Sequence, residues 1–101
     1  MKLSTAILKG CKIRRKTSAQ LFEDNKSCAL GAAYEGVTGK YNGGGELTLL
    51  RKKFPILRRV APKSSKSWGY SETIEEIIIS RNDTLGWSRE KIARWLKKLG
   101  H

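Results

Sequence analysis

The sequence predicts a mainly α-helical protein, a compact bundle of four or five short helices with room for one small β-hairpin. Apolar residues recur at helical spacing in several short segments. Serine, glycine and proline separate these segments where helices would begin and end. A chain of 101 residues fits a single hydrophobic core. We therefore expect residues 1–101 to form one basic helical domain.

The N-terminal quarter predicts a helix followed by a hairpin. Leu3, Ile7 and Cys11 share one side of a helix over about 3–12. Residues 20–26 combine a short apolar stretch with a polar Asp-Asn-Lys turn, which is compatible with a minimal β-hairpin.

The next two helices follow from small and apolar residues. Ser27 is the expected N-cap of a helix over 28–37, whose alanines and glycines would let another helix approach closely. This helix should stop at Gly36 or Gly39. A third amphipathic helix should start at Glu46 and end near proline 55.

The C-terminal third predicts two more helices. Ser71 is the expected N-cap of the fourth helix, which should end around 82–86. The acidic patch at its start suits the helix dipole and would pair with cations of the same chain: Glu72, Glu75 and Glu76. Ser88 is the expected cap of the fifth helix, over 89–99.

A large excess of positive charge points to an acidic partner. The chain has 21 Lys and Arg against 9 Asp and Glu, a net charge of +12. Nucleic acid is the commonest partner of such a chain. The alternatives are an acidic protein, as for a bacterial or phage interaction or inhibitor module docking on a host protein, or anionic lipid. Basicity that serves solubility alone is the remaining interpretation.

We expect the cations of three segments to meet on one basic face that contacts phosphates of DNA or RNA. If about six of them do so, affinity should fall about a thousandfold between about 50 and 200 mM salt. Phe54 and Trp68 lie beside the second segment and could stack on bases, although core packing is the preferred interpretation. The candidate contact residues are Lys12, Arg14, Arg15 and Lys16, then Arg51, Lys52, Lys53, Arg58, Arg59, Lys63 and Lys66, then Arg89, Lys91, Arg94 and Lys98.

The stretch GWSREKIARWL, residues 86–96, is similar to the second half of a DNA-binding helix-turn-helix. The first half fits poorly, because Asn82 stands where a small residue is expected and Arg81 where an apolar one is expected. We therefore favour a terminal amphipathic helix. Its core stripe would be Ile92, Trp95, Leu96 and Leu99.

Nothing in the sequence predicts a metal, a cofactor or an enzyme. Cys11 and Cys28 are the only cysteines, and the only histidine is the last residue. These residues lack the four-ligand spacing of a metal site. Two buried, reduced thiols in a cytoplasmic protein are expected, with a disulfide as the alternative. Cys28, at a helix N-terminus, is the one nucleophile worth testing.

A membrane span is not expected, because the longest apolar run has only three residues, at 77–79. The first sixteen residues carry basic flanks around a short apolar part that contains Lys9. They predict a helix rather than a secretory signal.

The blocks SCALGAAYE, at 27–35, and ND-x-x-x-WSRE-x-IA-x-W, at 82–95, resemble a group of small, uncharacterised bacterial and phage-encoded proteins. Many members of that group carry a C-P-x-C pair after a Phe-Pro dipeptide. In this chain the dipeptide is Phe54-Pro55, and the place of the pair is taken by Val-Ala-Pro-Lys at 60–63. The resemblance supports the fold and implies no activity. We expect Asn82 and Asp83 to be structural, bonding free backbone amides at a neighbouring turn.

Overall fold

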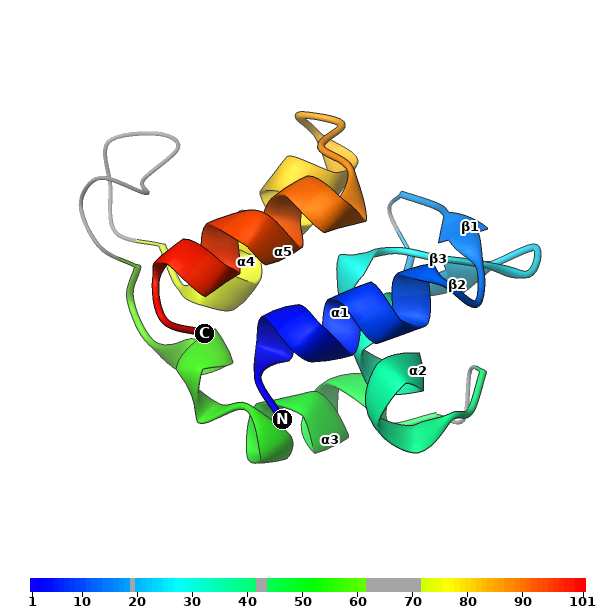
Figure 1. Ribbon diagram of the computed structural model, residues 1–101, viewed down its shortest axis with the longest axis horizontal. Helices are drawn as coiled ribbons and strands as arrows, with labels where there is room; N and C mark the ends of the chain where they lie inside the picture. The colour runs from blue at the N-terminus through cyan, green and yellow to red at the C-terminus, as the bar shows by residue number, and fades with distance from the viewer. Residues whose placement is uncertain (19, 42–43, 62–71) are drawn as a thin grey trace.

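The computed structural model describes residues 1–18, 20–41, 44–61 and 72–101 (Figure 1). Within these ranges the chain forms five α-helices, one short 3-10 helix and a three-stranded sheet. The predicted mainly helical bundle is confirmed. The helices are α1 (Leu3–Cys11), α2 (Ala29–Thr38), α3 (Glu46–Lys53), η1 (Pro55–Arg58), α4 (Ile74–Asp83) and α5 (Arg89–Lys98).

The helices α1 and α2 touch backbone to backbone. A Cβ atom at Gly10 would overlap the carbonyl of Ala32, and one at Gly36 would overlap the carbonyl of Ala6. The small residues of 29–33 therefore permit the close approach that the sequence predicted. α1 also packs against α5, so it lies between the two halves of the bundle.

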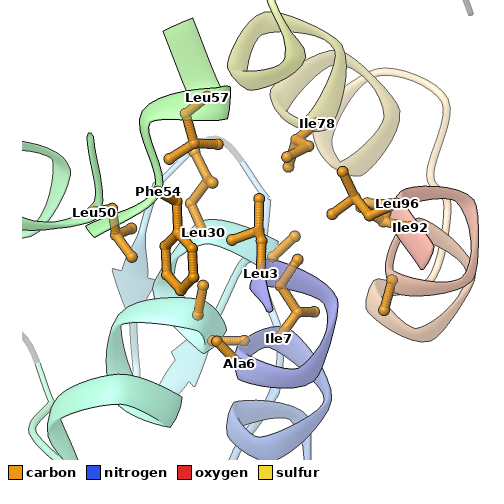
Figure 2. Packing of buried hydrophobic residues seen from close by; sticks show 14 of the residues in the cluster. Leu3, Ala6, Ile7, Leu30, Leu50, Phe54, Leu57, Ile78, Ile92 and Leu96 are labelled. Carbon is orange, nitrogen blue, oxygen red and sulfur yellow. The ribbon is translucent and has the colours of Figure 1, made fainter. Parts of the chain in front are cut away.

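Around this contact, every helix contributes to one apolar core (Figure 2). The side chains of Leu3 and Ile7 from α1 meet those of Ile92 and Leu96 from α5 and of Ile78 from α4. On the other side of α1, the core continues through residues of α2, α3 and η1 and through Phe54, which lies between α3 and η1. These residues are Leu30, Leu50, Phe54 and Leu57.

A small sheet lies between α1 and α2 in the chain. Its strands are β1 (Arg15–Lys16), β2 (Phe22–Glu23) and β3 (Lys26–Ser27), in the order β1-β3-β2. β2 and β3 form the predicted hairpin, with Asp24 and Asn25 in the left-handed conformation at its two-residue turn. β1 pairs parallel with β3, which the sequence did not predict.

Two helix starts differ from those expected. The N-cap of α2 is Cys28, whose sulfur accepts a hydrogen bond from Gly31 N, while Ser27 belongs to β3. The N-cap of α4 is Thr73, which forms a reciprocal capping box with Glu76. Ser71, the predicted cap, lies outside the described residues. The predicted cap of α5, Ser88, is confirmed, since its hydroxyl accepts from the Lys91 backbone N–H.

Asn82 joins the end of α4 to the start of α2. Its side chain is almost fully buried, and its Oδ1 accepts from the backbone N–H of Ala29 at 3.1 Å. Its Nδ2 donates to the Thr17 carbonyl at 3.0 Å and to Asp83 Oδ1 at 2.7 Å. The predicted structural role of Asn82 at a neighbouring helix start is confirmed. For Asp83, the hydrogen bond shown goes to the Asn82 amide instead of a backbone amide.

We expect Gly10→Ala to lower the free energy of unfolding by about 3 kcal/mol, because the added methyl would force two backbones apart. Helix propensity alone would favour alanine by about 1 kcal/mol, so a net loss reports the clash. Urea denaturation followed by circular dichroism measures it.

Gly39→Ala is the matched control. Gly39 has φ 72° and nothing near its Cβ position, so alanine should cost only about 1 kcal/mol of backbone strain. If Gly10→Ala were as stable as the unchanged protein, the close contact of α1 and α2 would be refuted.

Candidate nucleic-acid interface

Fewer than half of the acidic side chains are fully exposed. All of them lie in the described ranges, where Glu35, Glu46 and Glu72 are buried and Glu75 and Asp83 are half-buried. The remaining acidic residues are exposed: Glu23, Asp24, Glu76 and Glu90. The positive charge of the sequence is therefore expressed more strongly at the surface than in the composition.

Few cations are neutralised by ion pairs. In the described part of the chain, two ion pairs form, Arg14–Glu35 at 2.9 Å and Arg51–Glu75 at 2.7 Å. Arg51 thus confirms that Glu75 has a partner in the same chain. Many cations remain exposed: Lys2, Lys9, Lys12, Arg15, Lys26, Lys40, Lys52, Lys53, Arg58, Arg59, Lys91, Arg94, Lys97 and Lys98.

One group of these cations borders a shallow groove along α5. The groove is lined by two half-buried indoles and three exposed cations, and we call it the α5 groove: Trp87, Lys91, Arg94, Trp95 and Lys98. The three cations stand at positions i, i+3 and i+7 of the same helix, which places them along one side of it. Positive charge and aromatic surface therefore occur together at this place.

The two indoles are held by a buried arginine. The guanidinium carbon of Arg81 lies 4.5 Å from the ring centroid of Trp87 and 4.3 Å from that of Trp95. Burial lowers the pKa of Arg81 from its ordinary value, and the nearby Glu72 carboxylate opposes this shift. Contacts between a desolvated cation and aromatic rings are among the stronger of their kind, so Arg81 fixes both rings.

Two predicted contact residues instead hold the fold together. Arg89 is 5% exposed, and its guanidinium donates to Ser27 Oγ at 2.9 Å, to the Ser27 carbonyl at 3.3 Å and to the Arg14 carbonyl at 2.5 Å. Arg14 is half-buried, pairs with Glu35 and stacks on the Tyr41 ring. The structure gives Arg89 and Arg14 a structural role, because both join the sheet to the helices, and their expected contact with nucleic acid stays a prediction.

The other predicted contact residues divide into engaged and exposed ones. Lys16 is half-buried and donates to the Asn82 carbonyl at 3.0 Å, and Arg51 makes a two-pronged pair with Glu75. Lys63 and Lys66 lie outside the described residues, as does Trp68. The exposed ones are Lys12, Arg15, Lys52, Lys53, Arg58, Arg59, Lys91, Arg94 and Lys98.

The basic segments are spread along the length of the molecule. Figure 1 places β1 at one end of the long axis and the segment 55–61 toward the other end. The convergence of cations from the three segments, 12–16, 51–66 and 89–98, on one basic face stays a prediction. Among the described exposed cations, those of the α5 groove lie beside aromatic surface.

The structure favours the amphipathic-helix interpretation of residues 86–96. Ile92 and Leu96 are fully buried in the core. Arg89, which would meet base edges in a helix-turn-helix, points into the protein. Trp95, expected to be core, is only half-buried and lines the α5 groove, as does Trp87. Phe54 is buried, as the preferred interpretation of that residue predicted.

The α5 groove had no sufficient signal in the sequence. Trp87 and Trp95 are eight residues apart, and their pairing depends on Arg81, which comes from the preceding helix. Tryptophans flanking a cationic helix would have been the available hint, but the same pattern is typical of ordinary core packing.

The thiols do not have the properties of an activated nucleophile. Both cysteines are free, with Cys28 buried and Cys11 half-buried. Burial raises the pKa of Cys28 above its ordinary value and that of Cys11 from 9.0 to about 11. Since the thiolate is the reactive form, these shifts oppose reactivity at neutral pH.

The described residues contain neither a cluster placed to hold a metal ion nor a helix that could cross a membrane. No group of three or more His, Cys, Asp or Glu residues there is placed to hold a metal ion. None of the described helices is long and apolar enough to cross a bilayer.

No protein-family model, curated protein or solved structure matches this chain. The resemblance carried by the blocks at 27–35 and 82–95 therefore stays a prediction.

Arg89→Ala should lower the free energy of unfolding by about 3 kcal/mol, because Ser27 Oγ and the Arg14 carbonyl would each lose a charged donor. Arg94→Ala, an exposed substitution on the same helix, should change it by less than about 0.5 kcal/mol. Equal urea midpoints for the two variants would contradict the structural role of Arg89.

Alkylation by iodoacetamide should be at least about tenfold slower for both thiols in the folded protein at pH 8 than in urea, measured by mass spectrometry. The folded state holds the Cys11 proton more tightly than the unfolded state. This stabilisation is therefore complete below about pH 9 and is lost as the pH rises through about 11. Fast labelling of Cys28 in the folded protein would contradict its burial.

Proposed function

We propose that the protein binds nucleic acid without catalysing a reaction, mainly through contacts between exposed cations and phosphates. The observation that carries the proposal is the imbalance of the described surface, where exposed cations far outnumber exposed carboxylates and ion pairs are few. Neutralising phosphates releases counterions, which favours binding of such a surface to a polyanion.

The α5 groove is the part of this surface best suited to contact. Its three cations lie on one side of a helix whose other side is fixed in the core by Ile92 and Leu96. A charged surface on a rigid element loses little conformational freedom on binding. The exposed cations Lys52, Lys53, Arg58 and Arg59 supply a second group of candidate phosphate contacts. The free thiols support action in a reducing compartment such as the cytoplasm.

A second candidate is docking of the same groove on an acidic protein surface. Tryptophan and arginine are the residues most enriched among those that dominate protein–protein binding energy, and both line the groove. Pull-down from lysate treated with nuclease separates the two candidates. A partner retained after nuclease treatment favours a protein, whereas one lost with the nucleic acid favours our first proposal.

The salt dependence of binding tests the main proposal. Fluorescence anisotropy with labelled single- and double-stranded oligonucleotides should show affinity falling about a thousandfold between about 50 and 200 mM salt if about six phosphates are contacted. A variant with Lys91→Gln, Arg94→Gln and Lys98→Gln should bind more weakly and lower the slope of log affinity against log salt by about 3.

The matched control removes the same charge elsewhere, with Lys9→Gln, Lys26→Gln and Lys40→Gln, all exposed. It should alter the slope much less than the α5 variant. A flat salt response of the unchanged protein would overturn the proposal, and equal effects of the two variants would remove the α5 groove from it.

A further inference from the structure

We infer that the α5 groove selects single-stranded over double-stranded nucleic acid by stacking an unpaired base against its indole surface. This inference rests on the proposed function and narrows it to one strand type. It follows from two features of the groove, its tryptophan rings and the row of positive charges beside them. Among the described exposed cations, only those of the groove lie beside tryptophan rings.

The aromatic surface suits a flat, uncharged ring. Trp87 and Trp95 are half-buried, so each keeps part of its ring at the surface, and both line the groove. Bases stack on aromatic side chains irrespective of their sequence, because every base presents a π surface. In a duplex these surfaces are covered by neighbouring base pairs, so only an unpaired strand can offer one to the groove.

The cations suit the backbone on either side of such a base. Lys91 and Lys98 are seven residues apart on a helix, which corresponds to about 10 Å along its axis. A stacked strand rises about 3.4 Å along its axis per nucleotide, and a strand with one base withdrawn into the groove is more extended, so this row spans at most about three nucleotides. Arg94 lies between them in the row. A base in the groove would thus have cations near its flanking phosphates.

The rings are already in place before a ligand arrives. Arg81 lies within 4.5 Å of both ring centroids and is buried, so its stack fixes the indoles from the protein side. Lys91 is exposed, and its Nζ lies 4.1 Å from the Trp87 centroid. A long, exposed lysine can move its ammonium to a phosphate and leave that ring to a base. Preorganised rings lower the entropic cost of binding.

Paired oligonucleotides test the selection. The probes are a labelled 15-nucleotide strand without self-complementarity and the duplex of the same sequence, measured by anisotropy at equal salt. The unchanged protein should bind the single strand at least about tenfold more tightly. Trp87→Leu and Trp95→Leu should each weaken single-strand binding about tenfold, within the range of one lost base stack, and leave duplex binding unchanged.

Two further variants guard against loss of structure. Trp95→Phe keeps an aromatic ring and should restore part of the single-strand affinity. Leu85→Ala removes an exposed apolar side chain from the turn before α5 and should change neither affinity. Circular dichroism shows whether each leucine variant folds. If one does not, the selection is tested instead by quenching of tryptophan fluorescence in the unchanged protein. Quenching by the single strand and not by the duplex supports the inference, and equal quenching by both overturns it.

The outcomes separate this inference from the proposed function. Salt-sensitive binding of both probes with equal affinity, unaffected by the leucine variants, would refute base stacking and leave phosphate binding standing. Binding of neither probe at low salt would refute both. Vesicles containing anionic lipid are the last comparison. Binding to them that depends on Trp87 and Trp95, without binding to either oligonucleotide, would assign the groove to a membrane surface and overturn the inference.

Discussion

The direct contact between the backbones of α1 and α2 is the constraint on which the rest of the structure depends. Glycine at 10 and 36 lets the two helices touch, so both are fixed relative to each other without intervening side chains. The end of α1 then leads into β1. The start of α2 is positioned so that the backbone N–H of Ala29 donates to the side-chain oxygen of Asn82. Through Asn82 the position of α4 follows from the same contact, and α5 packs on the opposite side of α1.

Several polar residues that look like surface features in the sequence are part of this framework. Arg89 donates to two carbonyls of the sheet region, Arg14 pairs with the buried Glu35, and Arg81 stacks between two tryptophans. Burying these arginines is favourable only where acceptors and aromatic rings compensate for lost hydration, and each of them has such contacts. Carboxylates buried or paired in the same framework no longer offset the lysines outside, so the fold itself increases the positive character of the surface.

The parts of this structure that could be predicted are those decided locally. Periodic apolar residues indicated each helix, and Asp24-Asn25 indicated the hairpin because these residues tolerate the left-handed conformation. The parallel pairing of β1 with β3 joins residues eleven positions apart through a connection without its own signal. Arg89 and Lys91 show the same limit for the site. Both are cations near the start of α5, yet one is buried and one exposed. Helical spacing places Arg89 on the side of Ile92 and Leu96, but its partners Ser27 and Arg14 lie far away in the sequence and had no signal there.

The two sides of α5 explain how fold and surface are linked. Its inner side is held by Ile92 and Leu96 in the core and by Arg89 against the sheet, which fixes both its rotation and its position along α1. With the rotation fixed, the row of cations and the indoles must appear at the surface together, because they occupy the remaining sides of the same short helix and its preceding turn. The groove is therefore a consequence of core packing. A ligand that meets it finds a surface already ordered, and its binding energy is not spent on arranging loops.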